Sequence, residues 1–206
     1  GPEGDLAFFR SWFRAKYADK KRQKTPGSEN EDFEQIGSQF HTWFKNNLRN
    51  IGLRKPADFY FFVKSDMDFY SKVFLRIFNY RSEVGGDRDL FYVMTHYPMA
   101  DSLYLPFLMA PVSKVDGEKD IDEKLEMVNR FLDSFVNIRT LTHKTITQSS
   151  IRDSIYEMIK EVRECDISTL RAVIGKMIWS LAENMYNIDY VLDSYSGSYM
   201  HYFHAR

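Results

Sequence analysis

Two of the five histidines form the most metal-like pair of residues in this chain. His201 and His204 lie three residues apart, which would place both rings on one face of a helix. Two nitrogen ligands fall short of a zinc site, and no carboxylate lies close in sequence to join them. We therefore interpret the pair as an exposed helix end. His143 is either a phosphate contact or an ordinary connector residue, and we expect His41 on a helix surface and His96 at a helix end.

The remaining catalytic templates fail as well. Cys165 stands between Glu164 and Asp166, and two acids raise a thiol pKa, which works against a nucleophile. Gly85 and Gly86 are the only adjacent glycines, so a glycine-rich phosphate loop is absent. No histidine follows a glutamate by three residues, as a di-iron bundle requires. We expect no catalytic residue, no metal site and no cofactor in this segment, which is then not catalytic alone.

Positive charge is concentrated near the N-terminus. Residues 10–24 hold seven cations and one acid, whereas the rest of the chain holds 21 cations and 28 acids. Such segregation suggests an anionic partner, most simply the phosphates of duplex DNA. The alternative is a solvated helix face balanced by acids elsewhere in the fold. A smaller cluster could join this run in space; it consists of Arg139, His143, Lys144 and Arg152. The candidate DNA-binding residues are the run and two members of the cluster: Arg10, Arg14, Lys16, Lys20, Lys21, Arg22, Lys24, Arg139 and Lys144.

Apolar residues recur at helical spacing along most of the chain. The clearest stripes cover residues 6–17, 33–51, 69–80, 121–138, 151–162 and 170–181. Gly52 is a plausible end for the second stripe, and Pro56 can open the next helix at its first position. Asp66 is a good N-cap for the stripe that begins at Phe69. No stretch alternates with a period of two for more than a few residues.

Three segments are ambiguous. The run from Phe59 to Val63 is apolar all round, and Thr140 to Thr147 is polar and β-branched, so either could form a short strand. Pro106 falls inside an expected helix between Asp101 and Pro111, where it should cause a kink or divide the helix in two.

These patterns predict an all-α fold, a single globular domain of about eight or nine helices. Aromatic residues make up 16% of the chain, which argues against disorder and for an aromatic-rich core. No apolar run approaches the ~18 residues of a membrane helix, and a single cysteine fits a reducing compartment, so we expect a cytoplasmic protein without a membrane partner. Gly1 to Gly4 suggest an expression scar, with residues 5–206 forming a helical domain cut from a larger chain.

Several segments, taken in order, carry a family resemblance. They are residues 8–18, 29–37, 40–43, 51–53, 66–70, 135–139 and 202–206. In this order they resemble the helical middle region of large bacterial proteins that combine a ParB-like domain with an HNH nuclease domain. GmrSD-type, modification-dependent (type IV) restriction enzymes of anti-phage defence belong to this group. The resemblance covers most of the chain as a pattern, not as a catalytic signature.

The resemblance implies a helical module between a nucleotide-handling domain and a nuclease domain. The Asp-Gly-Gln-Gln-Arg motif of the first and the histidine motif of the second do not occur here, so no catalytic residue of the family can be assigned. We expect a linker that contacts DNA and the flanking domains of its parent. The alternative is a non-catalytic protein-protein interaction or oligomerisation domain.

Overall fold

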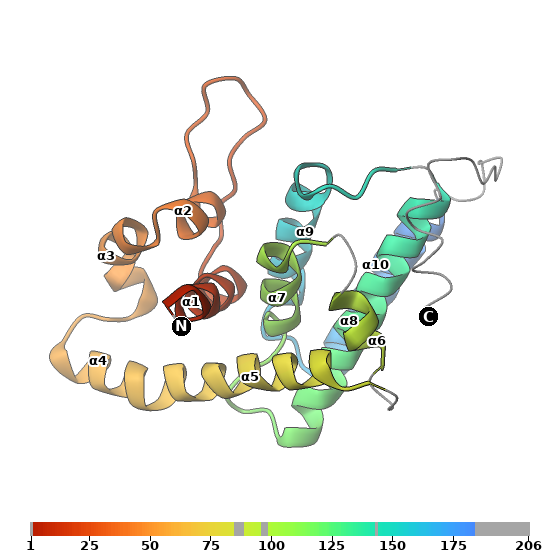
Figure 1. Cartoon of the computed structure of the whole chain (residues 1–206). Coiled ribbons are helices and arrows are strands. Elements are labelled where there is room, and N and C mark those ends of the chain that lie inside the picture. Colours follow the sequence, from red (N-terminus) through yellow and green to blue (C-terminus); the bar gives the residue numbers. More distant parts are fainter. Residues whose placement is uncertain (1, 85–88, 96–98, 143, 184–206) are drawn as a thin grey trace.

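The computed structural model describes residues 2–84, 89–95, 99–142 and 144–183 (Figure 1). Every regular element in this part of the chain is helical, which confirms the all-α class. In chain order the elements are α1 (Pro2–Lys16), α2 (Asp32–Ser38), α3 (Phe40–Ile51), α4 (Pro56–Phe61), the π-helical segment η1 (Phe62–Met67), α5 (Asp68–Ser82), α6 (Asp89–Thr95), α7 (Asp101–Met109), α8 (Glu118–Leu141), α9 (Gln148–Val162) and α10 (Ile167–Glu183).

Helix α1 lies at the centre of one half of the molecule, where α2, α5 and α7 pack against it (Figure 1). Its Trp12 and Phe13 are fully buried. The Trp12 ring stacks on Phe62 and Tyr70, with centroids 5.0 and 5.2 Å away. Phe13 meets Phe40 edge-on at 5.1 Å. An aromatic cluster built on α1 is therefore the core of this half, as the composition predicted.

The stripe from Phe33 to Ile51 forms two helices rather than the single one expected. Gln39 separates α2 from α3, with φ −134° and ψ 43°, outside the helical region. The two pieces have different partners, since Phe33 stacks on Tyr156 of α9 at 4.1 Å while Phe40 packs on Phe13. Gly52 does end α3, with φ 90°, as predicted.

The apolar run from Phe59 to Val63 is helical, not a strand. Helix α4 continues through η1 into α5, so Asp66 lies inside a continuous helical rod and is not an N-cap; its carboxylate instead pairs with Lys114. In an α-helix, residues eight apart differ by about 80° around the axis. The π-helical segment η1 has more residues per turn, which reduces this angular offset. Because η1 connects Phe62 to Tyr70, the two rings point the same way and both stack on Trp12.

Helix α7 is apolar all round, and its residues from Leu103 to Met109 are buried, as expected of a helix inside the core. It is a single helix despite Pro106, so the predicted division in two is wrong. Helix α8 packs against α6, α7 and α10, and α9 packs against α7 and α10. After α8 ends, residues 144–147 form a connector without a strand.

Candidate nucleic-acid interface

Two cations of the N-terminal run, Arg14 and Lys16, are buried. The Arg14 guanidinium donates to the carbonyl oxygens of Phe33 and Ser102, at 2.9 and 3.1 Å. It also lies over the Tyr156 ring, 5.9 Å from its centroid. Burial lowers the pKa of Arg14 from its ordinary value. This side chain joins α1 to α2, α7 and α9 and presents no charge to a surface ligand.

Lys16 occupies a similar place at the other end of α7. Its ammonium donates to the carbonyl oxygens of Ala110, at 2.8 Å, and Val112, at 2.5 Å, just after that helix ends. Burial lowers the pKa of Lys16 to about 7, although the Glu164 carboxylate at 3.6 Å opposes this. Cations near a helix C-terminus satisfy its free carbonyls. The role of Lys16 is thus helix capping inside the fold, a correction to its assignment as a DNA contact.

The next four cations follow α1 on the loop that projects beyond α2 (Figure 1). Lys20, Arg22 and Lys24 are exposed, and Lys21 is half-buried. Arg22 donates to the Ser28 hydroxyl at 3.1 Å. Within the described residues neither Lys20 nor Arg22 forms an ion pair, so these two side chains carry charge into solvent.

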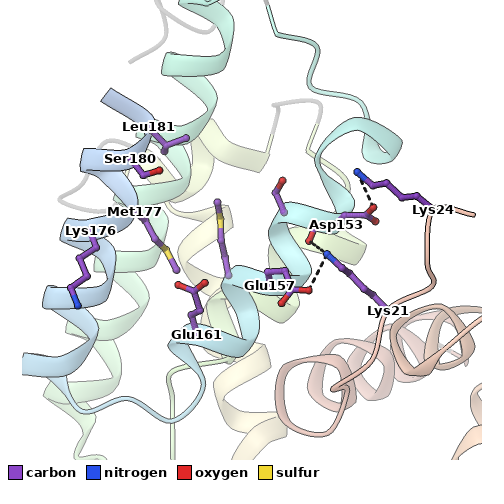
Figure 2. Close-up of a pocket in the computed structure, with 11 residues that line it drawn as sticks. Lys21, Lys24, Asp153, Glu157, Glu161, Lys176, Met177, Ser180 and Leu181 are labelled. Atoms are coloured by element: carbon purple, nitrogen blue, oxygen red, sulfur yellow. Dashed lines mark hydrogen bonds and ion pairs between the residues drawn. The ribbon is translucent and has the colours of Figure 1, made fainter. Parts of the chain in front are cut away.

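Lys21 and Lys24 instead face acids across an open cleft of about 540 Å³ between the loop, α9 and α10. Figure 2 shows both side chains extending toward α9, where Lys21 pairs with Glu157 at 2.9 Å and Lys24 with Asp153 at 3.5 Å. Glu161 lines the same cleft. These three acids are four residues apart, hence on one helix face. That spacing was the signal, missed in the sequence, that part of the basic run is balanced by α9.

The other candidate cations have separate surroundings. Arg10 is half-buried, and its Nε atom is buried without a hydrogen-bond partner. Arg139, at the end of α8, donates to the Thr145 carbonyl at 2.7 Å, and Lys144 is exposed. Arg152 does meet the run, because Asp153 accepts from it at 3.2 Å and also pairs with Lys24. No described contact links Arg139 or Lys144 to the run.

Most of the candidate metal ligands lie outside the residues that the structure describes. His41 is exposed on α3, as expected, while His96, His143, His201 and His204 lie outside the described residues. No group of three metal-ligating side chains occurs within the described residues. Burial and, to a smaller extent, the charge of Asp166 raise the pKa of the Cys165 thiol, which disfavours the thiolate.

A second basic surface was missed in the sequence. We call residues 40–65 the basic aromatic corner; it comprises α3, the connection 52–55, α4 and the first four residues of η1. It holds five exposed cations and a single acid, Asp58. Three of its aromatic side chains are exposed as well. Its five cations are spread over twenty residues, so cation density alone does not reveal this surface. The sequence signal is the scarcity of acids over the same stretch.

Comparisons of the chain with protein-family models, with curated proteins and with solved structures found no significant match. None of the described helices has the length and apolar character needed to cross a membrane.

Proposed function

We propose that this chain is a helical DNA-contacting module of a nucleotide-dependent, modification-dependent restriction protein. The resemblance of its ordered segments to the helical middle of ParB-like and HNH nuclease proteins supports the proposal. Its role would be to connect the two catalytic domains and hold duplex DNA by its phosphates. This follows the expectation from sequence, with a smaller set of contact residues.

The observation that carries the DNA contact is the exposed charge of the α1–α2 loop. Lys20 and Arg22 point charge into solvent without an acidic partner in the described structure, and Lys24 keeps 85% of its side chain exposed despite its ion pair. An exposed ion pair contributes little energy, at most about 1 kcal/mol, so a phosphate can replace Asp153 as the partner of Lys24. Arg14 and Lys16 are removed from the candidate set because their charges are used inside the fold.

The direct test is the salt dependence of duplex binding by wild type and by the variant K20Q/R22Q/K24Q. Each phosphate contact contributes about 0.9 to the slope of log K against log salt concentration. Loss of three contacts should flatten the slope by roughly 2 to 3 and weaken binding of every duplex sequence equally. K119Q/R130Q/R171Q, which removes three exposed cations on α8 and α10, is the matched charge control. Equal slopes for wild type and K20Q/R22Q/K24Q would reject the loop as a duplex contact.

The restriction context has its own test in the parent gene. The proposal expects an Asp-Gly-Gln-Gln-Arg motif upstream of this segment and a histidine-containing nuclease motif downstream. If the parent reading frame encodes neither motif, the restriction role fails, whatever the isolated module binds.

A protein-protein interaction or oligomerisation domain is the second candidate, favoured by apolar exposure on α5. Leu75 and Phe78 lie three residues apart and expose 60% and 41% of their surface. Light scattering over a range of concentrations distinguishes the candidates. A dimer that L75A/F78A converts to a monomer would favour the second.

A further inference from the structure

The charge of the basic aromatic corner is free to meet a ligand. Its cations are all exposed, and none forms an ion pair within the described residues; they are Lys45, Arg49, Arg54, Lys55 and Lys64. The lone carboxylate, Asp58, is already engaged. It accepts the backbone N–H groups of Arg54 and Lys55, at 2.8 and 2.7 Å, where α4 begins. These hydrogen bonds lower the pKa of Asp58. Five cations and one capped acid leave a local charge of +4.

The same corner exposes flat aromatic surface. Phe59, Tyr60 and Phe61 are consecutive on α4 and expose 40%, 59% and 64% of their surface. Isolated exposed apolar residues are common, but the rings of Tyr60 and Phe61 contact each other edge-on, with centroids 5.7 Å apart, and so form one exposed aromatic patch. The patch lies at the free end of the rod formed by α4, η1 and α5 (Figure 1).

The rod end is held rigidly although its rings are exposed. Phe62, the next residue, is buried and stacks on the fully buried Trp12 with their planes 18° apart. Tyr70, two turns further along, stacks on the same Trp12 ring, with centroids 5.2 Å apart. Rings on an anchored helix lose little entropy when a ligand stacks on them, which favours affinity.

We propose that the basic aromatic corner binds single-stranded nucleic acid, with unpaired bases stacking on Tyr60 and Phe61 and phosphates held by Arg54, Lys55 and Lys64. Surfaces for single strands combine cations that track the backbone with rings on which bases stack. Tyr60 and Lys64 are four residues apart, so a ring and a cation share one helix face. This inference is independent of the proposed function, since it concerns another ligand and another surface.

The same observations disfavour three other ligands of the corner: duplex DNA, a second copy of the chain and a membrane surface. A duplex hides its base faces in the stack and offers the rings nothing to stack on. A second copy in a two-fold dimer would place this patch against itself, bringing two charges of +4 together. A helix that inserts in a membrane surface separates its apolar face from its charged face, whereas Lys64 shares the face of Tyr60.

The test is fluorescence anisotropy with a labelled oligothymidine of about 15 nucleotides, the upper range for one small binding surface. Wild type should bind it more tightly than a duplex of the same length. Y60A/F61A should weaken binding by about tenfold or more for each lost stacking ring. The salt slope should not change, because no phosphate contact is removed. W179A, which removes an equally exposed ring on α10, should bind like wild type.

The cations have a separate signature. R54Q/K55Q/K64Q should reduce the salt slope by about 2, since each phosphate contact on a single strand contributes about 0.7. K20Q/R22Q/K24Q should leave oligothymidine binding unchanged, which separates this inference from the duplex contact of the loop. Because all these side chains are exposed, thermal melting should show the variants folded.

Three results would overturn the inference. The first is Y60A/F61A binding oligothymidine as well as wild type does. The second is binding of wild type to vesicles containing anionic lipid, lost in Y60A/F61A, without binding to oligothymidine. The third is self-association of wild type that Y60A/F61A abolishes.

Discussion

The guanidinium of Arg14 donates a 3.1 Å hydrogen bond to the carbonyl oxygen of Ser102. In a regular α-helix that oxygen accepts from the residue four positions later. Here that residue is Pro106, which has no N–H to give. Arg14 therefore supplies, from α1, the donor that proline removes from α7. This contact explains how a proline is tolerated in a short buried helix.

Replacing Arg14 by methionine should lower the free energy of unfolding by about 3 kcal/mol, measured by urea denaturation. The substitution leaves the part-buried carbonyl oxygen of Ser102 without a donor and removes the second donor of the Phe33 carbonyl oxygen, which lies inside α2. An unsatisfied group costs roughly 1 to 3 kcal/mol, and the lost buried bond to Phe33 adds to that cost. The change Arg22→Met on the exposed loop is the control and should alter stability by less than about 0.5 kcal/mol.

A double-mutant cycle tests the link to Pro106 itself. Alanine at this position restores an N–H that can donate to Ser102. Pro106→Ala should therefore be more favourable by about 1 kcal/mol in the R14M background than in wild type. Additive effects of the two changes would contradict the compensation described above.

Gly37→Ala should destabilise the fold by about 1 to 3 kcal/mol, because a Cβ there would lie 2.1 Å from Nη2 of Arg14. Arg14 is buried and hydrogen-bonded, so it cannot easily move away. Gly175→Ala on α10 is the matched control, since no atom lies within 4 Å of its added Cβ. That change should stabilise by up to about 1 kcal/mol, the ordinary gain of alanine over glycine in a helix. Thermal or urea unfolding measures the stability of both variants. If Gly37→Ala and Gly175→Ala changed stability in the same direction, the predicted clash with Arg14 would be wrong.

Lys16 should make stability rise with pH above neutrality. Its pKa is about 7 in the native protein, lowered by burial, against an ordinary value of 10.5 in the unfolded chain. Between these values the unfolded state binds more protons at Lys16, so the free energy of unfolding increases with pH. Below about pH 7 both states are protonated and this dependence stops.

The measurement is the difference in unfolding free energy between wild type and Lys16→Met from pH 6 to about 9.5. The difference in unfolding free energy should be constant near pH 6 and should then increase in favour of wild type as the pH rises above about 7. Staying below pH 10 avoids Tyr17 and Tyr70, whose pKa values are raised by burial and whose ionisation in the unfolded chain would reverse the trend. A difference that does not change with pH would show that Lys16 stays charged in the fold.

Lys124→Met should cost about 3 to 5 kcal/mol of stability. The Lys124 side chain is 1% exposed, and its ammonium lies 2.7 Å from the carboxylate of Asp116, whose side chain is 9% exposed. Its removal leaves a nearly buried carboxylate without its partner, which is strongly destabilising. Lys119→Met, an exposed position on the same helix, should be nearly neutral. If both changes cost the same, the ion pair contributes nothing specific.

The sequence by itself determined the helices, because each needs only a local pattern. Apolar spacing located most of them, Gly52 ended α3, and Pro56 opened α4, since these are properties of a few consecutive residues. The all-α class and the aromatic core followed. The break at Gln39 did not follow, because the apolar spacing continues across it and only the structure shows Phe33 and Phe40 packing on different helices.

Only the tertiary structure decided what each cation does. Arg14 and Lys20 are equivalent cations of the basic run in the sequence. In the structure the buried Arg14 donates to a carbonyl oxygen of α7, whereas Lys20 is exposed to solvent. That difference arises because α1 is surrounded by α2, α5 and α7, so even its polar positions meet protein. Likewise, the acids of α9 reach Lys21 and Lys24 from more than 120 residues away in sequence. Charge balance and burial are properties of neighbours in space, which no local pattern records.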